Sequence, residues 1–259
     1  MGTALVTGAS AGLGIEFARL CAADGHAVVL VARRAERLQA LADELQHTHR
    51  TRCLVVPQDL AAADAAERVL AAIATAGLPP PTILINNAGL GAHGPFAETT
   101  AEATSRQIQV NIALPTELTR RCLPAMRAAG HGRILVVAST AAFTPGPLMA
   151  VYYATKAHVL SWSEALHEEL RGTGITVTCV CPGPVRTEFQ RVAGLDTETP
   201  VRGLKLMPAD VVARAGYRAM LHGRAISIPG LRNRVLALVS RLLPHSLLRR
   251  IVHRLQRRR

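Results

Sequence analysis

Short runs rich in valine, isoleucine and leucine alternate along this chain with longer alanine- and leucine-rich segments of helical period. This alternation is typical of strands joined by helical crossovers. Such strands pair in parallel, and right-handed crossovers place helices on both faces of the sheet. We therefore predict an α/β fold, a single Rossmann-type doubly wound domain with a seven-stranded parallel sheet. The expected strands are Thr3–Thr7, Ala27–Ala32, Cys53–Gln58, Ile83–Asn86, Arg133–Ala138, Thr176–Cys181 and Ala225–Ile228.

Composition and length are consistent with one continuous aliphatic core. Hydrophobic residues make up 49% of the chain but aromatic residues only 3%, which suits buried parallel strands. A chain of 259 residues commonly forms one such domain, which we place at residues 1–230. Residues 188–208 are polar and too long for an ordinary connection, which favours a substrate lid. The expected helices include Gly14–Ala23, Arg34–Gln46, Ala62–Thr75, Ala103–Ala128 and Tyr152–Arg171.

A glycine-rich turn, TGASAGLG from Thr7 to Gly14, follows the first expected strand and opens a helix. Glycines in this position permit a tight turn and a close approach of the backbone to a pyrophosphate. The N-terminus of the helix offers free N–H groups to the same anion. This context predicts a dinucleotide site. The residues expected to contact the cofactor are Gly8, Ser10, Ala11, Gly12, Leu13 and Gly14.

The end of the second strand indicates which nicotinamide cofactor is bound. An NAD site uses an acid there for the ribose 2′-hydroxyl, but this chain carries Arg33 and Arg34. Arginine can hold the 2′-phosphate of NADP through charge-assisted hydrogen bonds. We therefore expect NADP(H) as the cofactor. The alternative is that the two arginines are only a solvated helix start.

A tyrosine and a lysine stand four residues apart at the start of the helix after the fifth strand. Tyr152 and Lys156 therefore lie on one helical face. A neighbouring ammonium favours phenolate and lowers the pKa of a tyrosine from its usual value of about 10. Ser139 closes the fifth strand at the carboxyl edge of the sheet, where ligands of α/β folds bind. The pattern predicts acid/base chemistry at Tyr152.

These motifs together resemble those of the short-chain dehydrogenase/reductase family, from residue 3 to about residue 230. One departure is Ala11, where many NADP-preferring members carry a basic residue, so that a phosphate must rely on Arg33 and Arg34. In the family's order, the motifs are the turn Thr7–Gly14, Asp59-Leu60, Asn86-Asn87-Ala88-Gly89, Val110-Asn111, Ser139, Tyr152 with Lys156, and Pro182-Gly183 with Thr187.

The resemblance implies a catalytic role for Asn111, Ser139, Tyr152 and Lys156. Tyr152 would give a proton to a carbonyl oxygen during reduction, while Ser139 hydrogen-bonds the same oxygen. Lys156 would lower the pKa of the tyrosine and hold the nicotinamide ribose. Asn111 would anchor a water molecule that links Lys156 to solvent.

The resemblance also implies the remaining cofactor contacts. Asp59 would bind the adenine amino group, Asn87 and its neighbours the adenine ribose side of the cleft, and Thr187 the carboxamide. The complete set beyond the glycine turn and the two arginines is Asp59, Leu60, Asn87, Ala88, Gly89, Tyr152, Lys156, Pro182, Gly183, Val185 and Thr187.

Other polar residues show no catalytic pattern. The ten histidines lack metal-ligand spacing, and we expect no metal. The five cysteines are scattered and suit a reduced core. Tyr153 faces about 100° away from Tyr152 on a helix, so we expect it to serve packing.

The net charge of +12 lies entirely in the last part of the chain. Residues 211–259 carry twelve arginines and no acid, whereas basic and acidic residues balance before them. The pattern of residues 231–259 predicts a basic extension of two amphipathic helices that are separated at Pro244. The apolar stripe could dock on the protein or on a second subunit, or the extension could lie on an anionic membrane. Nucleic acid is disfavoured because no aromatic residues are interleaved.

The leading hypothesis is an NADP(H)-dependent oxidoreductase, a ketoreductase or alcohol dehydrogenase, that acts on a carbonyl or alcohol substrate. Apolar segments at Leu90–Phe96 and Thr140–Met149 favour a hydrophobic substrate. The alternative is a non-catalytic nucleotide sensor or scaffold that uses the basic tail for membrane or partner contact. The sequence shows no signal-peptide pattern and no spanning apolar stretch. We expect a homo-oligomer that is cytoplasmic or peripheral to a membrane.

Overall fold

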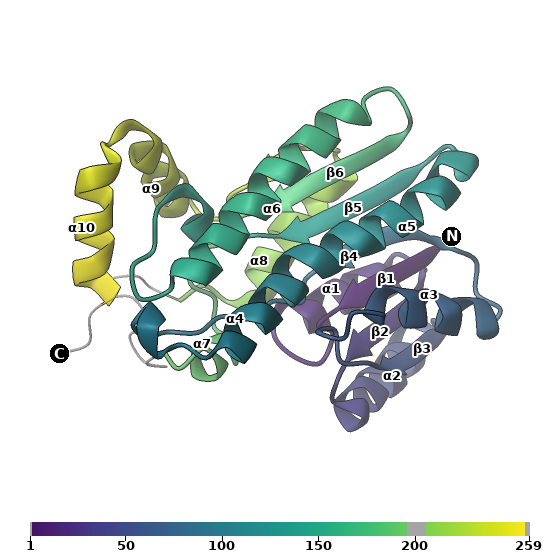
Figure 1. Ribbon diagram of the computed structural model, residues 1–259. Helices are drawn as coiled ribbons and strands as arrows, with labels where there is room; N and C mark the ends of the chain where they lie inside the picture. Colours follow the sequence, from purple (N-terminus) through teal and green to yellow (C-terminus); the bar gives the residue numbers. More distant parts are fainter. Residues whose placement is uncertain (1, 196–205, 257–259) are drawn as a thin grey trace.

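The computed structural model describes residues 2–195 and 206–256. Seven parallel strands form one sheet in the order β3-β2-β1-β4-β5-β6-β7, with helices on both faces (Figure 1). The predicted fold class and doubly wound arrangement are confirmed. The strands are β1 (Thr3–Thr7), β2 (Ala27–Ala32), β3 (Cys53–Pro57), β4 (Pro81–Asn86), β5 (Gly132–Val137), β6 (Ile175–Val180) and β7 (Ile226–Ser227).

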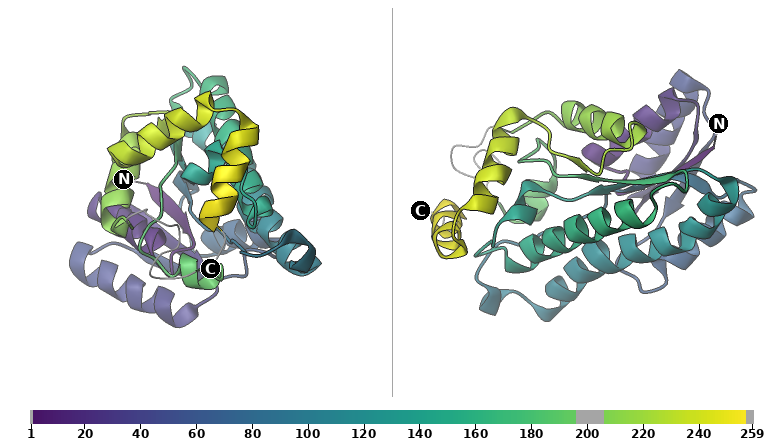
Figure 2. Two further views of the ribbon diagram at one scale, coloured as in Figure 1. Left: turned by 90° about the vertical axis from the view of Figure 1, so that its left-hand side faces the viewer. Right: turned by 90° about the horizontal axis from the view of Figure 1, so that it is seen from above.

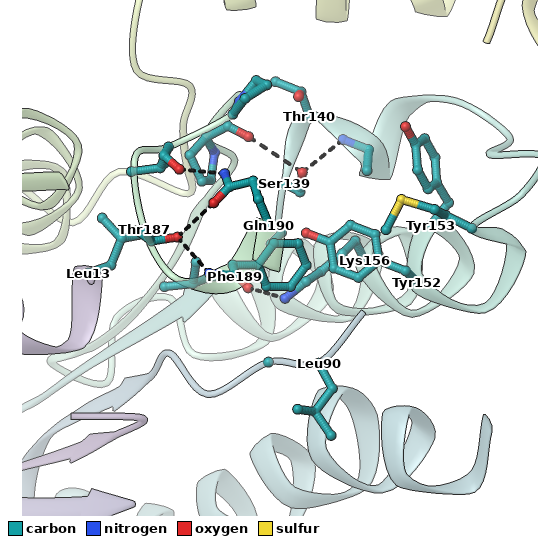
Figure 3. Close-up of a pocket in the computed structure, with 18 of the residues that line it drawn as sticks. Leu13, Leu90, Ser139, Thr140, Tyr152, Tyr153, Lys156, Thr187, Phe189 and Gln190 are labelled. Atoms are coloured by element: carbon teal, nitrogen blue, oxygen red, sulfur yellow. Dashed lines mark hydrogen bonds between the residues drawn. The ribbon is translucent and has the colours of Figure 1, made fainter. Parts of the chain in front are cut away.

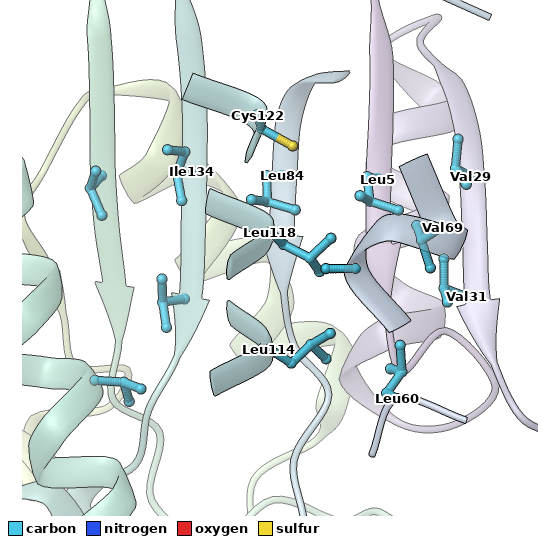
Figure 4. Packing of buried hydrophobic residues seen from close by; sticks show 14 of the residues in the cluster. Leu5, Val29, Val31, Leu60, Val69, Leu84, Leu114, Leu118, Cys122 and Ile134 are labelled. Atoms are coloured by element: carbon cyan, nitrogen blue, oxygen red, sulfur yellow. The ribbon is translucent and has the colours of Figure 1, made fainter. Parts of the chain in front are cut away.

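Alternate side chains of the strands enter two separate layers of the core. Leu5 of β1 joins Val29 and Leu84 in one layer (Figure 4), whereas Ala4 and Val6 join the other. Successive strand residues point to opposite faces, and here both faces are buried. This arrangement explains why the strands are continuous aliphatic runs rather than alternating ones.

Six helices supply the two layers that cover the sheet. The helices on the face of Val6 are α1 (Leu13–Ala23), α2 (Ala35–His49) and α8 (Ala209–Leu221). The helices on the face of Leu5 are α3 (Ala65–Thr75), α5 (Leu114–Ala129) and α6 (Ala150–Glu169).

The single helix predicted at Ala103–Ala128 is interrupted. In the structure, α4 (Ala101–Ile108) passes into a π-helical turn at Gln109–Ala113, and α5 begins after that turn. The turn contains Asn111, which is buried. A π-helical turn inserts one residue into the helical ladder and often occurs at a functional site. Hydrophobic periodicity does not register such a short insertion, so the prediction of one helix was wrong here.

Two helices follow β7, and Pro244 separates them as predicted. They are α9 (Leu231–Leu242) and α10 (His245–Gln256), drawn in yellow, at the left-hand end of the molecule in Figure 1 and in the right view of Figure 2. The predicted lid contributes α7 (Phe189–Val192), and its residues 196–205 lie outside the described part of the chain. Among the described helices, none has the length and apolar character needed to cross a membrane.

Candidate active site

The glycine turn after β1 is built so tightly that side chains would not fit. Gly8 and Gly12 have φ values of 69° and 54°, which favour glycine. A Cβ atom on Gly12 would lie 2.6 Å from Cγ2 of Thr187, and one on Gly14 would lie 2.2 Å from the carbonyl oxygen of Gly8. The turn therefore packs on itself and against the loop after β6. The predicted residues Gly8, Ser10, Ala11, Gly12 and Leu13 line a cavity, whereas Gly14 supports the turn from behind.

Asn87, at the end of β4, joins this turn to the neighbouring loop. Its side-chain amide donates to the carbonyl oxygen of Thr7 at 2.9 Å, and the Thr7 hydroxyl accepts from the backbone N–H of Asn87 at 3.0 Å. The backbone N–H of Ala88 donates to the same hydroxyl at 3.1 Å. The loops after β1 and β4 are thus held at a fixed separation on one side of the cavity.

The two arginines after β2 differ in their surroundings. Arg34 donates to the hydroxyl of Ser10 at 3.0 Å and forms an ion pair with Glu188 at 2.7 Å. Arg37 pairs with the same carboxylate at 2.8 Å, and hydrogen bonds from Arg37 and Arg34 lower the pKa of Glu188 to about 2. Arg33 lines the cavity, is exposed, and makes no hydrogen bond with the described residues. Arg33 is therefore the cation that a bound anion can take without displacing another partner.

Asp59 and Leu60 line the cavity on the side of β3, as predicted. The Asp59 carboxylate accepts from the backbone N–H of Ala61 at 3.1 Å and from Arg106 at 3.0 Å. The sequence patterns did not indicate Arg106, because its ion pair joins residues on separate elements of the fold.

Ser139, Tyr152 and Lys156 meet in the cavity at the carboxyl end of β5 (Figure 3). The ammonium Nζ of Lys156 lies 5.7 Å from the centroid of the Tyr152 ring and donates to the carbonyl oxygen of Val137 at 2.8 Å. The hydroxyl of Ser139 accepts from the backbone N–H of Ala141 at 3.1 Å. This bond fixes the position of the hydroxyl beside the phenol.

Burial shifts the pKa values of both titratable groups toward their neutral forms. Desolvation raises the pKa of the Tyr152 phenol, and a hydrogen bond with Ser139 opposes that shift only in part. Desolvation also lowers the pKa of Lys156 to about 8. The direction for Tyr152 is opposite to the lowering expected from the sequence. The reason is that the apolar surroundings penalise a phenolate as well as the ammonium that would stabilise it.

Asn111 is buried behind the cavity and does not line it. Its amide oxygen accepts from the backbone N–H of Leu90 at 2.8 Å, and its amide nitrogen donates to the Leu90 carbonyl and to the Thr155 hydroxyl, both at 2.9 Å. Asn111 thus ties the loop after β4 to α6. Its expected role as a water anchor stays a prediction.

The loop after β6 supplies the opposite wall through Pro182, Gly183, Val185 and Thr187. The Thr187 hydroxyl accepts from the backbone N–H of Phe189, at 3.2 Å. The ring of Phe189, on α7, lies 5.2 Å from the Tyr152 ring, centroid to centroid. The structure therefore places the first part of the predicted lid directly over the phenol.

The family model described as short chain dehydrogenase matches residues 2–197. The chain belongs to this family. It is 33% identical to a short chain dehydrogenase of Pseudocercospora fijiensis, over 72% of this chain and 60% of that protein. It is also 33% identical to the ketoacyl reductase HetN of a Nostoc species, over 77% of this chain and 72% of HetN.

A solved short-chain dehydrogenase from Sphingobium yanoikuyae, in complex with NADPH, has the same architecture. Its TM-score is 0.81 at 34% sequence identity, and the match covers 92% of both chains. The protein described here is therefore an oxidoreductase of the short-chain dehydrogenase family with a Rossmann-like fold.

The residues of this short-chain dehydrogenase fit a nicotinamide dinucleotide. The turn at Gly12 and Leu13 opens the N-terminus of α1 toward the cavity, where backbone N–H groups favour a pyrophosphate. Arg33 offers a cation at the end of β2, and the cavity of about 680 Å³ continues from there to Tyr152. A dinucleotide lying along this path would bring its nicotinamide to Lys156 and Tyr152.

Sequence reasoning missed the part of the cavity wall that comes from the C-terminal helices. The apolar residues that they contribute are Leu236, Ala237, Val239, Leu243, Leu248, Ile251, Val252 and Leu255. The amphipathic pattern did predict an apolar stripe that can dock. It could not identify the surface on which the stripe docks, because the partner lies elsewhere in the sequence.

The end of α10 is held in place beside the catalytic helix. The side-chain amide of Gln256 donates to the phenol oxygen of Tyr153 at 2.8 Å, and the ring Nε2 of His93 donates to the carbonyl oxygen of Gln256 at 3.0 Å. Tyr153 lines the cavity, and its ring lies 6.0 Å from that of Tyr152. Tyr153 thus packs against Tyr152, as expected, and its phenol also anchors the C-terminal helix.

Within the described residues, no three His, Cys, Asp or Glu side chains gather as metal ligands. All five cysteines are free, and four of them are buried in the core.

Proposed function

We propose that this protein is a ketoreductase or alcohol dehydrogenase that transfers a hydride between NADP(H) and the carbonyl or alcohol carbon of a hydrophobic substrate. The observation that carries the proposal is that Ser139, Tyr152 and Lys156 meet in one apolar cavity that continues to the glycine turn. Tyr152 is the acid/base in this proposal. The ketoacyl reductase activity in the name of HetN supports the same reaction class.

Bound NADPH supplies the hydride. The Tyr152 phenol donates its proton to the carbonyl oxygen during reduction, and the raised pKa of this buried phenol keeps the proton in place until then. Ser139 is fixed by Ala141 and donates a hydrogen bond to the same oxygen. Lys156 holds the nicotinamide ribose and stabilises the phenolate left after proton transfer. Lys156 then passes a proton to the phenolate of Tyr152, and Asn111, which holds the loop at Leu90, anchors the water that replaces this proton on Lys156.

Arg33 and Arg34 support a preference for NADP(H) over NAD(H). Arg33 lines the cavity and makes no hydrogen bond with the described residues, so it is the first candidate for the 2′-phosphate. Arg34 is already paired with Glu188, so it can contact the 2′-phosphate only if its guanidinium binds the phosphate and the Glu188 carboxylate together. The NADPH bound by the Sphingobium relative is consistent with this preference. Asp59, Asn87 and Thr187 take the adenine, adenine ribose and carboxamide positions in the proposal.

The aliphatic wall of the cavity favours a hydrophobic or bulky substrate over a sugar or an acid. We assign residues 1–230 to the catalytic domain and residues 188–208 to its substrate lid. We assign the basic extension, residues 231–259, to a cap, which is the segment that covers one side of the cavity. The homo-oligomeric state stays a prediction, which light scattering of the purified chain tests. The cytoplasmic location also stays a prediction, which cell fractionation tests.

The test is NADPH oxidation with purified protein and a panel of aliphatic, aromatic and polycyclic ketones. Wild type should turn over hydrophobic ketones. Tyr152→Phe should lose at least about a hundredfold in kcat but keep its affinity for NADPH, because only the transferable proton is removed. Tight NADPH binding without turnover of any ketone would favour the alternative, a nucleotide sensor or scaffold. More than a tenth of wild-type activity in Tyr152→Phe would show that another group is the acid.

A further inference from the structure

The outer face of α9 carries a stripe of aliphatic side chains exposed to solvent. Leu231, Val235, Leu238 and Leu242 are between 51% and 76% exposed and recur every three or four residues. On an adjoining side the same helix contributes Leu236 and Val239 to the cavity wall, and Leu243 adds to the wall directly after the helix ends. A helix that is apolar on two sides is normally covered on both. The stripe therefore indicates that something outside the described chain covers it.

Exposed aliphatic residues are concentrated on the hairpin formed by α9 and α10. Of the fourteen large hydrophobic residues exposed in the described part of the chain, nine belong to these two helices. Single exposed hydrophobic residues need no explanation, but a contiguous patch marks an interaction surface. The concentration on one hairpin makes this surface the candidate.

The charge of the hairpin decides between the two obvious occupants. Residues 231–256 contain six arginines and no acidic residue. A second copy seated on the same face would bring the basic hairpins of the two copies together, which is unfavourable at close range. An anionic lipid surface supplies apolar acyl chains for the stripe and negative headgroups for the arginines.

We propose that the α9–α10 hairpin binds an anionic lipid bilayer through the stripe Leu231, Val235, Leu238 and Leu242, with the arginines of α10 contacting the headgroups. The surface does not depend on the reaction assigned to the cavity. Because α9 also forms a wall of the cavity, binding would place the substrate site directly beside the lipid. A hydrophobic substrate could then enter without crossing bulk water.

Flotation of the full-length protein with phosphatidylcholine vesicles, with and without phosphatidylglycerol, tests the proposal. Wild type should float only with the anionic vesicles, and more weakly at high salt. Leu231→Gln, Leu238→Gln and Leu242→Gln together should lose at least tenfold in affinity while every charge is kept. Arg249→Gln, Arg250→Gln and Arg254→Gln together should lose about a hundredfold, since each cation near an anionic surface contributes about 1 kcal/mol.

The matched control replaces Val211 and Leu221 on α8 by Gln, because both are exposed but lie outside the hairpin. This control should float like wild type. Unchanged NADPH binding and thermal melting show that each variant is folded. Vesicle binding that survives the loss of the three leucines would be nonspecific attraction of a basic protein and would overturn the proposal. A dimer that the leucine variant dissociates, without vesicle binding by wild type, would assign the stripe to a second copy instead.

Discussion

The buried ammonium of Lys156 lowers the stability of the folded protein near neutral pH. Its side chain is only 5% exposed, and desolvation lowers its pKa from the usual 10.5 to about 8. This lowering of the pKa corresponds to about 3 kcal/mol against the charged form. Replacing Lys156 by Met removes this penalty but leaves the carbonyl of Val137 without its donor, which costs about 1 kcal/mol. We therefore expect Lys156→Met to raise the free energy of unfolding by about 2 kcal/mol at pH 7.

The sign of the pH dependence follows from the direction of the shift. Between pH 8 and 10.5 the unfolded chain binds more protons at Lys156 than the folded chain, so the contribution of Lys156 to stability rises with pH in this window. At pH 9.5 this contribution should be about 2 kcal/mol more favourable than at pH 7, and the advantage of Lys156→Met should have nearly vanished.

Urea unfolding of both proteins at pH 7 and pH 9.5 measures the two differences. Arg218→Met, which removes an exposed cation from α8, is the control and should change stability by less than about 0.5 kcal/mol at either pH. Two results would refute the reasoning. One is a Lys156→Met protein less stable than wild type at pH 7, and the other is a stability difference that does not change with pH.

Two further predictions concern the cofactor and the cap. Arg33→Asp should weaken NADPH binding by about 1–3 kcal/mol and move the preference toward NADH, because a charged hydrogen bond to the phosphate is lost. Titration with both cofactors measures this, and wild-type turnover that is faster with NADH would contradict it. Gln256→Leu removes the hydrogen bond to Tyr153 and should raise KM several-fold for bulky ketones, with little change for small ketones or for NADPH. Equal KM values for wild type and variant across ketone sizes would show that the bond does not shape the site.

Much of the fold could be read from the sequence because local patterns determine it. Continuous aliphatic runs located all seven strands to within two residues at each end, since a parallel strand buried on both faces requires such a run. The glycine turn was equally clear, because the φ values of Gly8 and Gly12 and the space around Gly12 restrict those positions to glycine. The π-helical turn at Asn111 was missed because hydrophobic periodicity does not register an inserted residue, and the hydrogen-bond partners of Asn111, Leu90 and Thr155, are distant in the sequence.

Some features of the candidate site could likewise be predicted from the sequence, whereas others depended on the tertiary structure. The sequence by itself determined that Ser139, Tyr152 and Lys156 would lie together, because strand ends and helical spacing bring them to one edge of the sheet. Only the tertiary structure decided the direction of the Tyr152 pKa shift, because desolvation depends on every element that packs around the phenol. It also decided that α10 closes the cavity through Gln256, which is 103 residues from its partner Tyr153. An amphipathic helix specifies that one of its faces will be covered, but the covering surface exists only once the rest of the chain has folded.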